Sequence, residues 1–315
     1  MKNIDLSIVI PFYNEKENLP ELHKELLTIL EPLKKTFEII YVDDGSIDQS
    51  DDGLRSAINN KKIDNVEVKE VTLTRNFGQT AATAAGIDNS NGRLIGFLDA
   101  DLQNDPHDLI KFFGEMDKGY DAILGWRKDR RDTSGRSAAS KIANFLIRRV
   151  FDVPIHDVGC SLRIVKREIL ENMHLYGEAH RILPVLIYWK SSKVIEMETN
   201  HRKRLYGQSK YGYSRVLKLI IDLITVKFLN NYGTKPAYVF GAVGIICSML
   251  GGLILMIVAY NKFVNGIYVY LQPLFLVAIF LILVGLQFIL MGLLAELLIR
   301  TYYESQKKTI YEIRK

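Results

Sequence analysis

Short apolar runs alternate with amphipathic stretches between residues 4 and 126 of the chain. Each run has the length of a strand and is followed by a polar cluster, and the stretches between the runs have helical periodicity. The runs cover residues 4–12, 37–42, 66–73, 94–103 and 121–126. The intervening stretches predict helices that end near residues 35 and 60, and a third helix over 79–87. This alternation predicts a doubly wound, mostly parallel α/β sheet, because consecutive parallel strands need right-handed crossovers.

Polar clusters follow the strands of this predicted sheet. Ligands of doubly wound sheets bind beyond the carboxyl ends of the strands, near the point where the strand order reverses. The clusters at 11–15, 43–46, 75–78 and 99–103 all follow strands, so we expect them to line one crevice. The chain has no Gly-x-Gly-x-x-Gly motif and no Walker-type lysine, which argues against a dehydrogenase or an ATPase. Phosphate binding would instead depend on a metal ion and on basic side chains.

Two carboxylates, Asp99 and Asp101, end the apolar run 94–103. Side chains alternate along a strand, so we expect the two carboxylates to point the same way. With the amide of Gln103 they offer the hard oxygen ligands that suit Mg²⁺ or Mn²⁺, which would hold the phosphates of a substrate. The alternative is a solvated turn before a helix that Asp105 caps. Such a cap explains Asp105 but leaves the pair unexplained.

Two uncharged runs of about 25 residues each, 236–260 and 271–295, follow the mixed-charge part of the chain. Each is long enough to cross a bilayer core of roughly 30 Å, and neither has the polar face of a soluble helix. Lys and Arg flank the outer ends of both runs, while the connection between them holds only Lys262. The positive-inside rule then predicts that both termini and the N-terminal domain lie in the cytoplasm. The first apolar run is too short for a signal peptide and is broken by Pro11.

Net charge and cysteine usage fit a cytoplasmic domain that rests on a membrane. The 315 residues carry a formal net charge of +5, which suits a surface on anionic lipid. Nucleic-acid binding is the competing interpretation, but the basic residues cluster beside the membrane runs and not on a nucleic-acid module. The two cysteines, Cys160 and Cys247, form no disulfide framework, as expected in a reducing compartment.

Six short motifs, in order along the chain, resemble those of the family 2 glycosyltransferases. They are 11–15 (Pro-Phe-Tyr-Asn-Glu), 42–46 (Val-Asp-Asp-Gly-Ser), 75–78 (Arg-Asn-Phe-Gly), 99–103 (Asp-Ala-Asp-Leu-Gln), 157–163 (Asp-Val-Gly-Cys-Ser-Leu-Arg) and 204–211 (Arg-Leu-Tyr-Gly-Gln-Ser-Lys-Tyr). More narrowly, the motifs and the two spans resemble the polyprenyl-phosphate sugar transferases, which include dolichyl-phosphate mannose synthases and bacterial undecaprenyl-phosphate glycosyltransferases. Any single motif is a weak signal, whereas six in order together with the spans are a strong one.

This resemblance implies a GT-A (Rossmann-like) fold that binds a nucleotide sugar, in the first place a UDP-sugar. It implies that Asp44, with Asp43, reads the base. The residues implied around the nucleotide are Pro11, Tyr13, Glu15, Asp43, Asp44, Arg75 and Asp99, and those implied around Mg or Mn are Asp99, Asp101 and Gln103. Most have an ordinary structural alternative, such as a strand end at Pro11 or a helix-capping turn over 43–46.

The resemblance also implies that the acceptor is a polyprenyl phosphate, either undecaprenyl or dolichyl phosphate. A phosphate monoester is anionic at neutral pH, so transfer requires positioning and charge management more than activation of the nucleophile. Asp157 would orient the sugar or accept a proton, and basic residues would hold the acceptor phosphate. The basic candidates are Arg127, Arg202, Arg204 and Lys210, with a solvated or lipid-facing charge run as the alternative.

The predicted organisation has four parts. They are a cytoplasmic GT-A domain over 1–210, a juxtamembrane amphipathic helix over 211–233, a transmembrane hairpin of two helices over 234–300 and a cytoplasmic basic tail over 301–315. Amphipathic patterns over 214–229 and 136–151 predict helices at the membrane interface, where a polyprenyl phosphate presents its head. For 136–151, a packing helix with a basic outer face is the alternative.

The resulting hypothesis is an inverting, metal-dependent transfer of a sugar from a nucleotide to a polyprenyl phosphate. A processive polysaccharide synthase would carry a Gln-x-x-Arg-Trp motif and more spans, and the chain has neither. A catalytically silent membrane scaffold would have damaged metal residues, and these are intact. The identity of the sugar stays open, and so does the oligomeric state, for which the resemblance leaves a homotetramer as an option.

Overall fold

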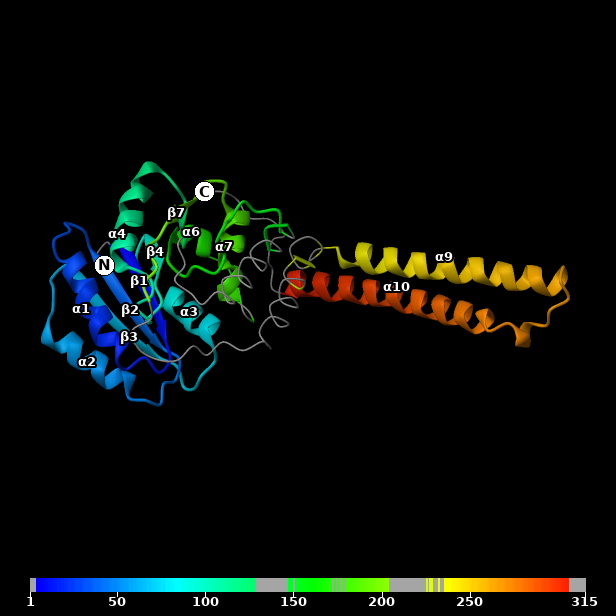
Figure 1. The fold of residues 1–315 in the computed structure, drawn as a ribbon, viewed down its shortest axis with the longest axis horizontal. Coiled ribbons are helices and arrows are strands. Elements are labelled where there is room, and N and C mark those ends of the chain that lie inside the picture. Colours follow the sequence, from blue (N-terminus) through cyan, green and yellow to red (C-terminus); the bar gives the residue numbers. More distant parts are fainter. Residues whose placement is uncertain are drawn as a thin grey trace. The chain divides into compact units, whose positions relative to one another are not determined.

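The computed structural model describes residues 4–128, 147–149, 151–171, 173, 175, 177, 179–203, 225, 227–228, 232 and 235–305. The chain forms two compact units, Met1–Leu223 and Ile224–Lys315. The first is built around a β-sheet and the second around two long helices (Figure 1). The predicted domain boundaries after residues 210 and 233 fall outside the described residues.

Among the described residues, the first unit contains a seven-stranded sheet with the order β3-β2-β1-β4-β6-β5-β7 (Figure 1). The strands are β1 (Leu6–Phe12), β2 (Phe37–Asp43), β3 (Val66–Thr72), β4 (Leu94–Phe97), β5 (Ala122–Trp126), β6 (Arg163–Lys166) and β7 (Val194–Glu198). β1 pairs in parallel with β2 and with β4, so the strand order reverses at β1. β6 is antiparallel to both β4 and β5, whereas β7 is parallel to β5. The predicted mostly parallel, doubly wound sheet is therefore confirmed.

Helices cover both faces of this sheet (Figure 1). On one face α1 (Asn18–Leu30) packs beside α2 (Ser50–Asn60) and α4 (Pro106–Glu115). On the other face α3 (Gln79–Asp88) packs against β1 and β2 and beside α7 (Ala179–Lys190). The four-residue α6 (Arg167–Leu170) follows β6 directly. The three helices predicted before residue 90 are all present.

Successive side chains of β1 point to opposite faces of the sheet, so this strand packs against the helices on both faces. Ile8 and Ile10 are fully buried in the core cluster that also contains the leucines of α1. Val9 points to the opposite face, where a Cβ added at Gly86 of α3 would clash with its Cγ1. The small residue at this position therefore lets α3 approach the centre of the sheet.

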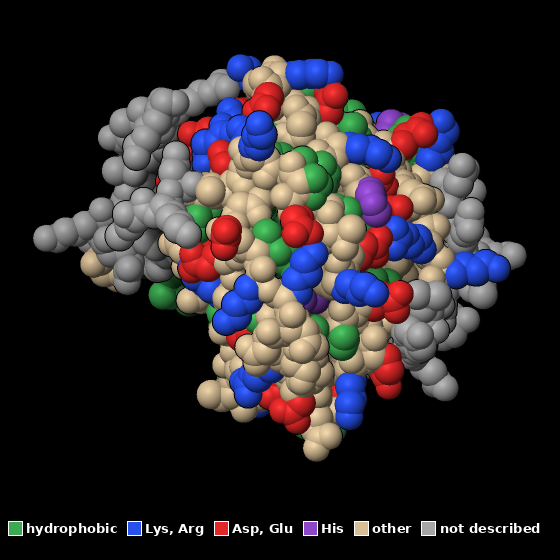
Figure 2. All heavy atoms as spheres, turned by 90° about the vertical axis from the view of Figure 1, so that its left-hand side faces the viewer, with side chains coloured by type: hydrophobic (Ala, Val, Ile, Leu, Met, Phe, Trp, Pro, Cys, Tyr) green, Lys and Arg blue, Asp and Glu red, His purple; other side chains and the backbone are tan. Residues whose placement is uncertain are grey.

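Solvent reaches the edge of the sheet at β3. Its side chains are partly buried or exposed, in contrast to the fully buried β2 beside it. Figure 2 shows one face of the molecule, on which basic and acidic side chains are interspersed. Two of the exposed ion pairs are Arg55–Glu70, between α2 and β3, and Lys61–Glu31, between the residues that follow α2 and α1. A surface of mixed sign is typical of a solvated face and not of a nucleic-acid site.

The second unit is a hairpin of two apolar helices, α9 (Pro236–Phe263) and α10 (Leu274–Ser305), with the short helix η2 (Val269–Leu271) between them. Both helices are long and apolar enough to cross a membrane. Their facing positions are small: a Cβ added at Gly244 would lie 2.5 Å from the Gly285 carbonyl oxygen. The prediction of two apolar spans is confirmed as far as length and composition test it.

Some predicted features lie outside the described residues or differ from the structure. The interfacial helix over 214–229 is described only at 225 and 227–228, and that over 136–151 only at 147–149 and 151, all of them helical. Phe151 is buried and packs edge-on against Trp189 of α7, as in the packing alternative. β6, β7 and α7 were not predicted.

A buried histidine joins α1 to β2. Nδ1 of His23 is hydrogen-bonded to the hydroxyl of Tyr41 at 3.0 Å, and both side chains are almost fully buried. Burial disfavours the charged imidazolium, so it lowers the pKa of His23 from 6.5 to about 4. The histidine is therefore neutral in the folded chain at physiological pH.

This histidine makes stability depend on pH. Because the folded-state pKa lies below the unfolded one, the unfolded chain takes up the proton first as the pH falls from 6.5 to about 4. We expect the free energy of unfolding to fall by on the order of 3 kcal/mol across that pH window because of His23. Thermal unfolding of wild type and His23→Gln between pH 7.5 and 4 measures this. The substitution should flatten the decline, and an unchanged slope would contradict the assignment.

Candidate active site

The loops after β1 and β2 are joined by hydrogen bonds between side chains and backbone. The Asn14 backbone N–H donates to Ser46 Oγ at 3.0 Å, and the Asn14 side chain accepts from the Ile47 N–H at 2.9 Å. The Glu15 N–H donates to Ser50 Oγ at 2.9 Å. Asn14 has a φ of 55°, in the left-handed region that asparagine tolerates. The motifs 11–15 and 42–46 therefore form one structure at the carboxyl edge of the sheet.

Asp44 joins this structure to the loop before α3. Its buried carboxylate accepts hydrogen bonds from the backbone N–H groups of Phe77, at 2.7 Å, and Gly78, at 2.9 Å. Gly45, with a φ of 71°, packs so tightly that an added Cβ would lie 2.5 Å from the carbonyl carbon of Arg75. Arg75 is exposed and its guanidinium lies over the ring of Phe77, 4.6 Å from the ring centre.

The remaining residues predicted around the nucleotide lie at the same edge. Pro11 pairs with β2 inside the sheet, and Tyr13 and Glu15 are partly buried in the following loop. The Glu15 side chain accepts from the amide of Asn18 at 2.6 Å, at the start of α1. The buried Asp43 accepts from the Ser46 N–H at 2.8 Å. The structure thus brings these residues together, and their roles toward a nucleotide stay predictions.

The carboxylate pair lies in a turn and not on a strand. β4 ends at Phe97, so the expected alternation along a strand does not extend to Asp99 and Asp101. Between Asp101 and Gln103 the buried Leu102 has a φ of 58°. A left-handed conformation of this kind costs about 1–3 kcal/mol and persists only where the surroundings hold it. We call residues 99–103 the carboxylate turn.

Polar groups from three other segments surround Asp99. Gln79 at the start of α3 donates from Nε2 to its Oδ1 at 3.0 Å. Burial, followed by the negative charge of Asp101, raises the pKa of Asp99, while a hydrogen bond from Ser161 and the charges of Arg163 and Arg127 oppose this. Burial and the neighbouring carboxylate thus both disfavour the ionised form of Asp99, and a bound cation would favour it.

Asp157 and Arg127 form a buried ion pair. Arg127 donates from Nε to Oδ2 of Asp157 at 2.8 Å and from Nη2 to Oδ1 at 3.1 Å, which is a bidentate geometry. The backbone N–H of Arg127 also donates to this carboxylate, at 3.2 Å. Although burial opposes it, the hydrogen bond from Arg127 to Asp157 raises the pKa of the guanidinium. Asp157 thus orients the Arg127 guanidinium, and its role toward the sugar or a proton stays a prediction.

Arg163 is a site residue for which sequence reasoning assigned no role. It lies on β6, it is 6% exposed, and its Nη1 has no hydrogen-bond partner among the residues that the structure describes. Its Nε donates to the Ser161 carbonyl oxygen at 3.0 Å, and its guanidinium lies 5.6 Å from the centre of the Phe97 ring. Burial lowers its pKa to about 10, so it remains charged at neutral pH. The motif 157–163 contains it, but only the antiparallel pairing of β6 with β4 places it beside the carboxylate turn.

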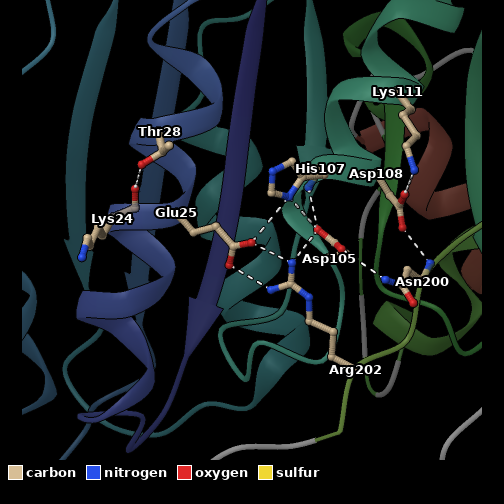
Figure 3. Close-up of polar contacts among 9 residues, drawn as sticks. All are labelled: Lys24, Glu25, Thr28, Asp105, His107, Asp108, Lys111, Asn200 and Arg202. Atoms are coloured by element: carbon tan, nitrogen blue, oxygen red, sulfur yellow. Dashed lines mark hydrogen bonds and ion pairs between the residues drawn. The ribbon is translucent and has the colours of Figure 1, made fainter.

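Arg202 lies in a second charged group (Figure 3). Its guanidinium makes a bidentate contact with Glu25, at 2.9 and 2.7 Å, and its Nη2 lies 2.7 Å from Oδ1 of Asp105. Potential metal-ligand atoms lie within 4.8 Å of one another on Glu25, Asp105 and His107. The cation between the two carboxylates, however, is the Arg202 guanidinium. Arg127 and Arg202 therefore belong to different ion-pair groups. Lys210 and Arg204 lie outside the described residues.

Solved structures of a glucosyl-3-phosphoglycerate synthase have a similar fold. Glucosyl-3-phosphoglycerate synthase from Mycobacterium tuberculosis, in complex with Mn²⁺, UDP and glucosyl-3-phosphoglycerate, matches with a TM-score of 0.55 at 14% identity, over 73% of this chain and 80% of that one. Its complex with Mg²⁺ and UDP matches with a TM-score of 0.54 over the same shares. The fold of the first unit, with the carboxylate turn at the strand reversal, is thus the GT-A fold of glycosyltransferases.

The chain belongs to glycosyl transferase family 2, whose pattern matches residues 7–173. It is 37% identical to the dodecaprenyl-phosphate galacturonate synthase of Rhizobium johnstonii, over 100% of this chain and 93% of that protein. It is 34% identical to the undecaprenyl-phosphate 4-deoxy-4-formamido-L-arabinose transferase of Proteus mirabilis, over 98% and 93%. The resemblance to polyprenyl-phosphate glycosyltransferases is therefore confirmed, and the protein is a glycosyltransferase.

The contact between Gly45 and Arg75 can be tested by adding a methyl group. In Gly45→Ala the added Cβ is strained by a left-handed φ and also clashes with backbone atoms. In Gly119→Ala the φ of 90° is also unfavourable, but nothing lies within 4 Å of the added Cβ. We expect Gly119→Ala to lose about 1–2 kcal/mol of stability and Gly45→Ala to lose clearly more. Chemical unfolding in detergent measures both. Equal losses would show that the loop yields to the methyl group without cost.

Proposed function

We propose that this glycosyltransferase transfers a sugar from a nucleotide sugar, a UDP-sugar, to a polyprenyl phosphate at the cytoplasmic face of the membrane, with inversion at the anomeric carbon. The observation that carries the proposal is the carboxylate turn, which sets Asp99 and Asp101 at the strand reversal of a GT-A sheet. Two full-length relatives that are named for polyprenyl-phosphate sugar products support the acceptor class.

The donor set of the carboxylate turn fits Mg²⁺ or Mn²⁺. Two carboxylates, Asp99 and Asp101, and the amide of Gln103 are hard oxygen donors. Burial and then the charge of Asp101 raise the pKa of Asp99, and a divalent cation would stabilise its ionised form. The structural neighbour with UDP was solved with either metal. When bound, the ion would offset the charge of the nucleoside diphosphate leaving group. Gln79 would then hold Asp99 in place through its hydrogen bond.

The chain's own cations would manage the remaining charge. Arg127 follows β5 and is oriented by Asp157, and it would hold a phosphate oxygen of the donor or of the acceptor. Arg163 adds a buried positive charge near Asp99 and opposes the mutual repulsion of the two carboxylates. Lys210 remains the proposed ligand of the acceptor phosphate on the basis of its motif. Because the acceptor phosphate is already anionic, we assign no general base.

The membrane placement rests on α9 and α10 and on the distribution of basic residues. Lys and Arg flank the outer ends of both helices, and their connection contains only Lys262. By the positive-inside rule both termini and the catalytic unit face the cytoplasm. A catalytic site on that side would meet cytoplasmic nucleotide sugars and the head of a polyprenyl phosphate.

A product assay tests the proposal and identifies the sugar. Purified protein is incubated with undecaprenyl phosphate, Mg²⁺ or Mn²⁺ and a panel of nucleotide sugars, and the lipid product is weighed by mass spectrometry. The panel includes a uronic acid and an aminoarabinose derivative, the sugar classes for which the two relatives are named. A glycosylated lipid phosphate is expected with at least one donor. Product on a growing glycan only would favour a polysaccharide synthase.

Replacement of Asp101 tests the carboxylate turn. Asp101→Asn removes one charge at nearly constant volume, so the fold should persist while the transfer rate falls by at least about 100-fold. Asp117→Asn, a surface position in a 3-10 helix, is the matched control and should transfer at the wild-type rate. Undiminished transfer by Asp101→Asn would overturn the assignment.

Calorimetry with UDP and Mn²⁺ should detect binding to wild type, which a catalytically silent scaffold without a nucleotide site would lack.

A further inference from the structure

A group of three charged residues holds residues 199–202 against α1 and the start of α4, next to the carboxylate turn. We call Glu25, Asp105 and Arg202 the clasp (Figure 3). Arg202 makes two hydrogen bonds with Glu25 on α1 and one close contact with Asp105, which caps α4. The Arg202 side chain is 32% exposed and those of its partners 21% and 14%, so the group is only partly screened by water.

The backbone of the same segment follows the carboxylate turn. The Arg202 N–H donates to the Gln103 carbonyl oxygen at 2.8 Å, and His201 forms an antiparallel bridge with Asn104. The Asn200 N–H donates to the buried Asp108 at 2.7 Å. The segment thus contacts the backbone directly beside the predicted metal ligands.

The turn needs an external restraint of this kind. Leu102 is held in the left-handed region between Asp101 and Gln103, and residues in that region relax unless neighbouring contacts hold them. On one side the Asn104 amide donates to Ser161 Oγ at 2.8 Å. On the other side the restraint is the segment that the clasp fixes.

The electrostatics of the clasp agree with a structural cation. Although burial opposes it, hydrogen bonds from His107 and Arg202 lower the pKa of Asp105. The hydrogen bond to Glu25 raises the pKa of Arg202. Both groups therefore stay ionised at physiological pH. An arginine already shared by two carboxylates has less charge to offer to a lipid phosphate.

We propose that Arg202 is a positioning residue which, through the clasp, holds the carboxylate turn in the geometry that binds the metal and the diphosphate. It does not hold the acceptor phosphate. This inference rests on the proposed function for the identity of the acceptor, and the clasp itself can be tested without the acceptor. Glu25 has the same role, although it lies 177 positions away in the sequence and outside all six motifs.

Substitutions at both ends of the ion pair separate the two roles of Arg202. The variants are Glu25→Gln, Arg202→Gln, Arg202→Lys and the double variant Glu25→Gln with Arg202→Gln. The matched control is Glu31→Gln, which removes an exposed ion pair with Lys61 just after the C-terminal end of α1. Three quantities are measured on the full chain: hydrogen exchange in peptides that cover 98–108, affinity for UDP with Mn²⁺, and the KM for undecaprenyl phosphate.

We expect Glu25→Gln and Arg202→Gln to speed hydrogen exchange over 98–108 and to weaken binding of UDP with Mn²⁺ by about 10-fold. The double variant should be no worse than Arg202→Gln, because both changes break one contact. Arg202→Lys should fall between wild type and Arg202→Gln, since it keeps the charge but loses the bidentate geometry. The control should match wild type, and the KM for the lipid should change less than about twofold in every variant.

Other outcomes would overturn the inference. A raised lipid KM in Arg202→Gln, with unchanged exchange and UDP affinity and with a normal Glu25→Gln, would make Arg202 an acceptor ligand. Wild-type values throughout would make the clasp irrelevant to the site. If Arg202→Gln does not fold, Arg202→Lys and Glu25→Gln still decide. Absence of glycosylated lipid from wild type would refute the proposed function, while the exchange data would still test the clasp.

Discussion

Two negative charges held side by side in one turn are the constraint on which the site depends. Asp99 and Asp101 repel each other, and burial of Asp99 adds to the cost of its charge. Gln79 at the start of α3, and Ser161 and Arg163 from the segment that leads into β6, offset part of this cost. The left-handed Leu102 adds backbone strain at the same place. A turn of this kind keeps its shape only because the surrounding fold restrains it, and a site strained in this way is typical of function.

Hydrogen bonds between side chains and backbone join the loops that follow separate strands into one surface. Parallel strands bring their carboxyl ends to one edge, but the loops that follow could still move independently. Asn14, Asp44 and Gln79 each link one loop to the next. Residues of the first three motifs thus hold one another in place.

The two units are stabilised by different physical means. The first buries leucine and isoleucine side chains between helices and sheet, where the hydrophobic effect operates. The hairpin of α9 and α10 leaves most of its large apolar side chains exposed and brings its helices together at small residues such as Gly244, Gly285 and Ala278. Small residues that allow close backbone approach are typical of helix pairs in lipid, where van der Waals packing replaces the hydrophobic effect.

The sequence by itself determined the elements and the chemistry that local patterns encode. Apolar periodicity predicted the first five strands, the helices between them and the two apolar spans, and the motifs indicated the carboxylates and the family. Only the tertiary structure showed that β6 inserts antiparallel between β4 and β5, which sets Arg163 beside the carboxylate turn. It also showed Arg127 paired with Asp157, and Arg202 held by Glu25 and Asp105. The physical reason is range: periodicity and capping act over a few residues, whereas the partner of a charged side chain depends on which distant segments the packed sheet brings together.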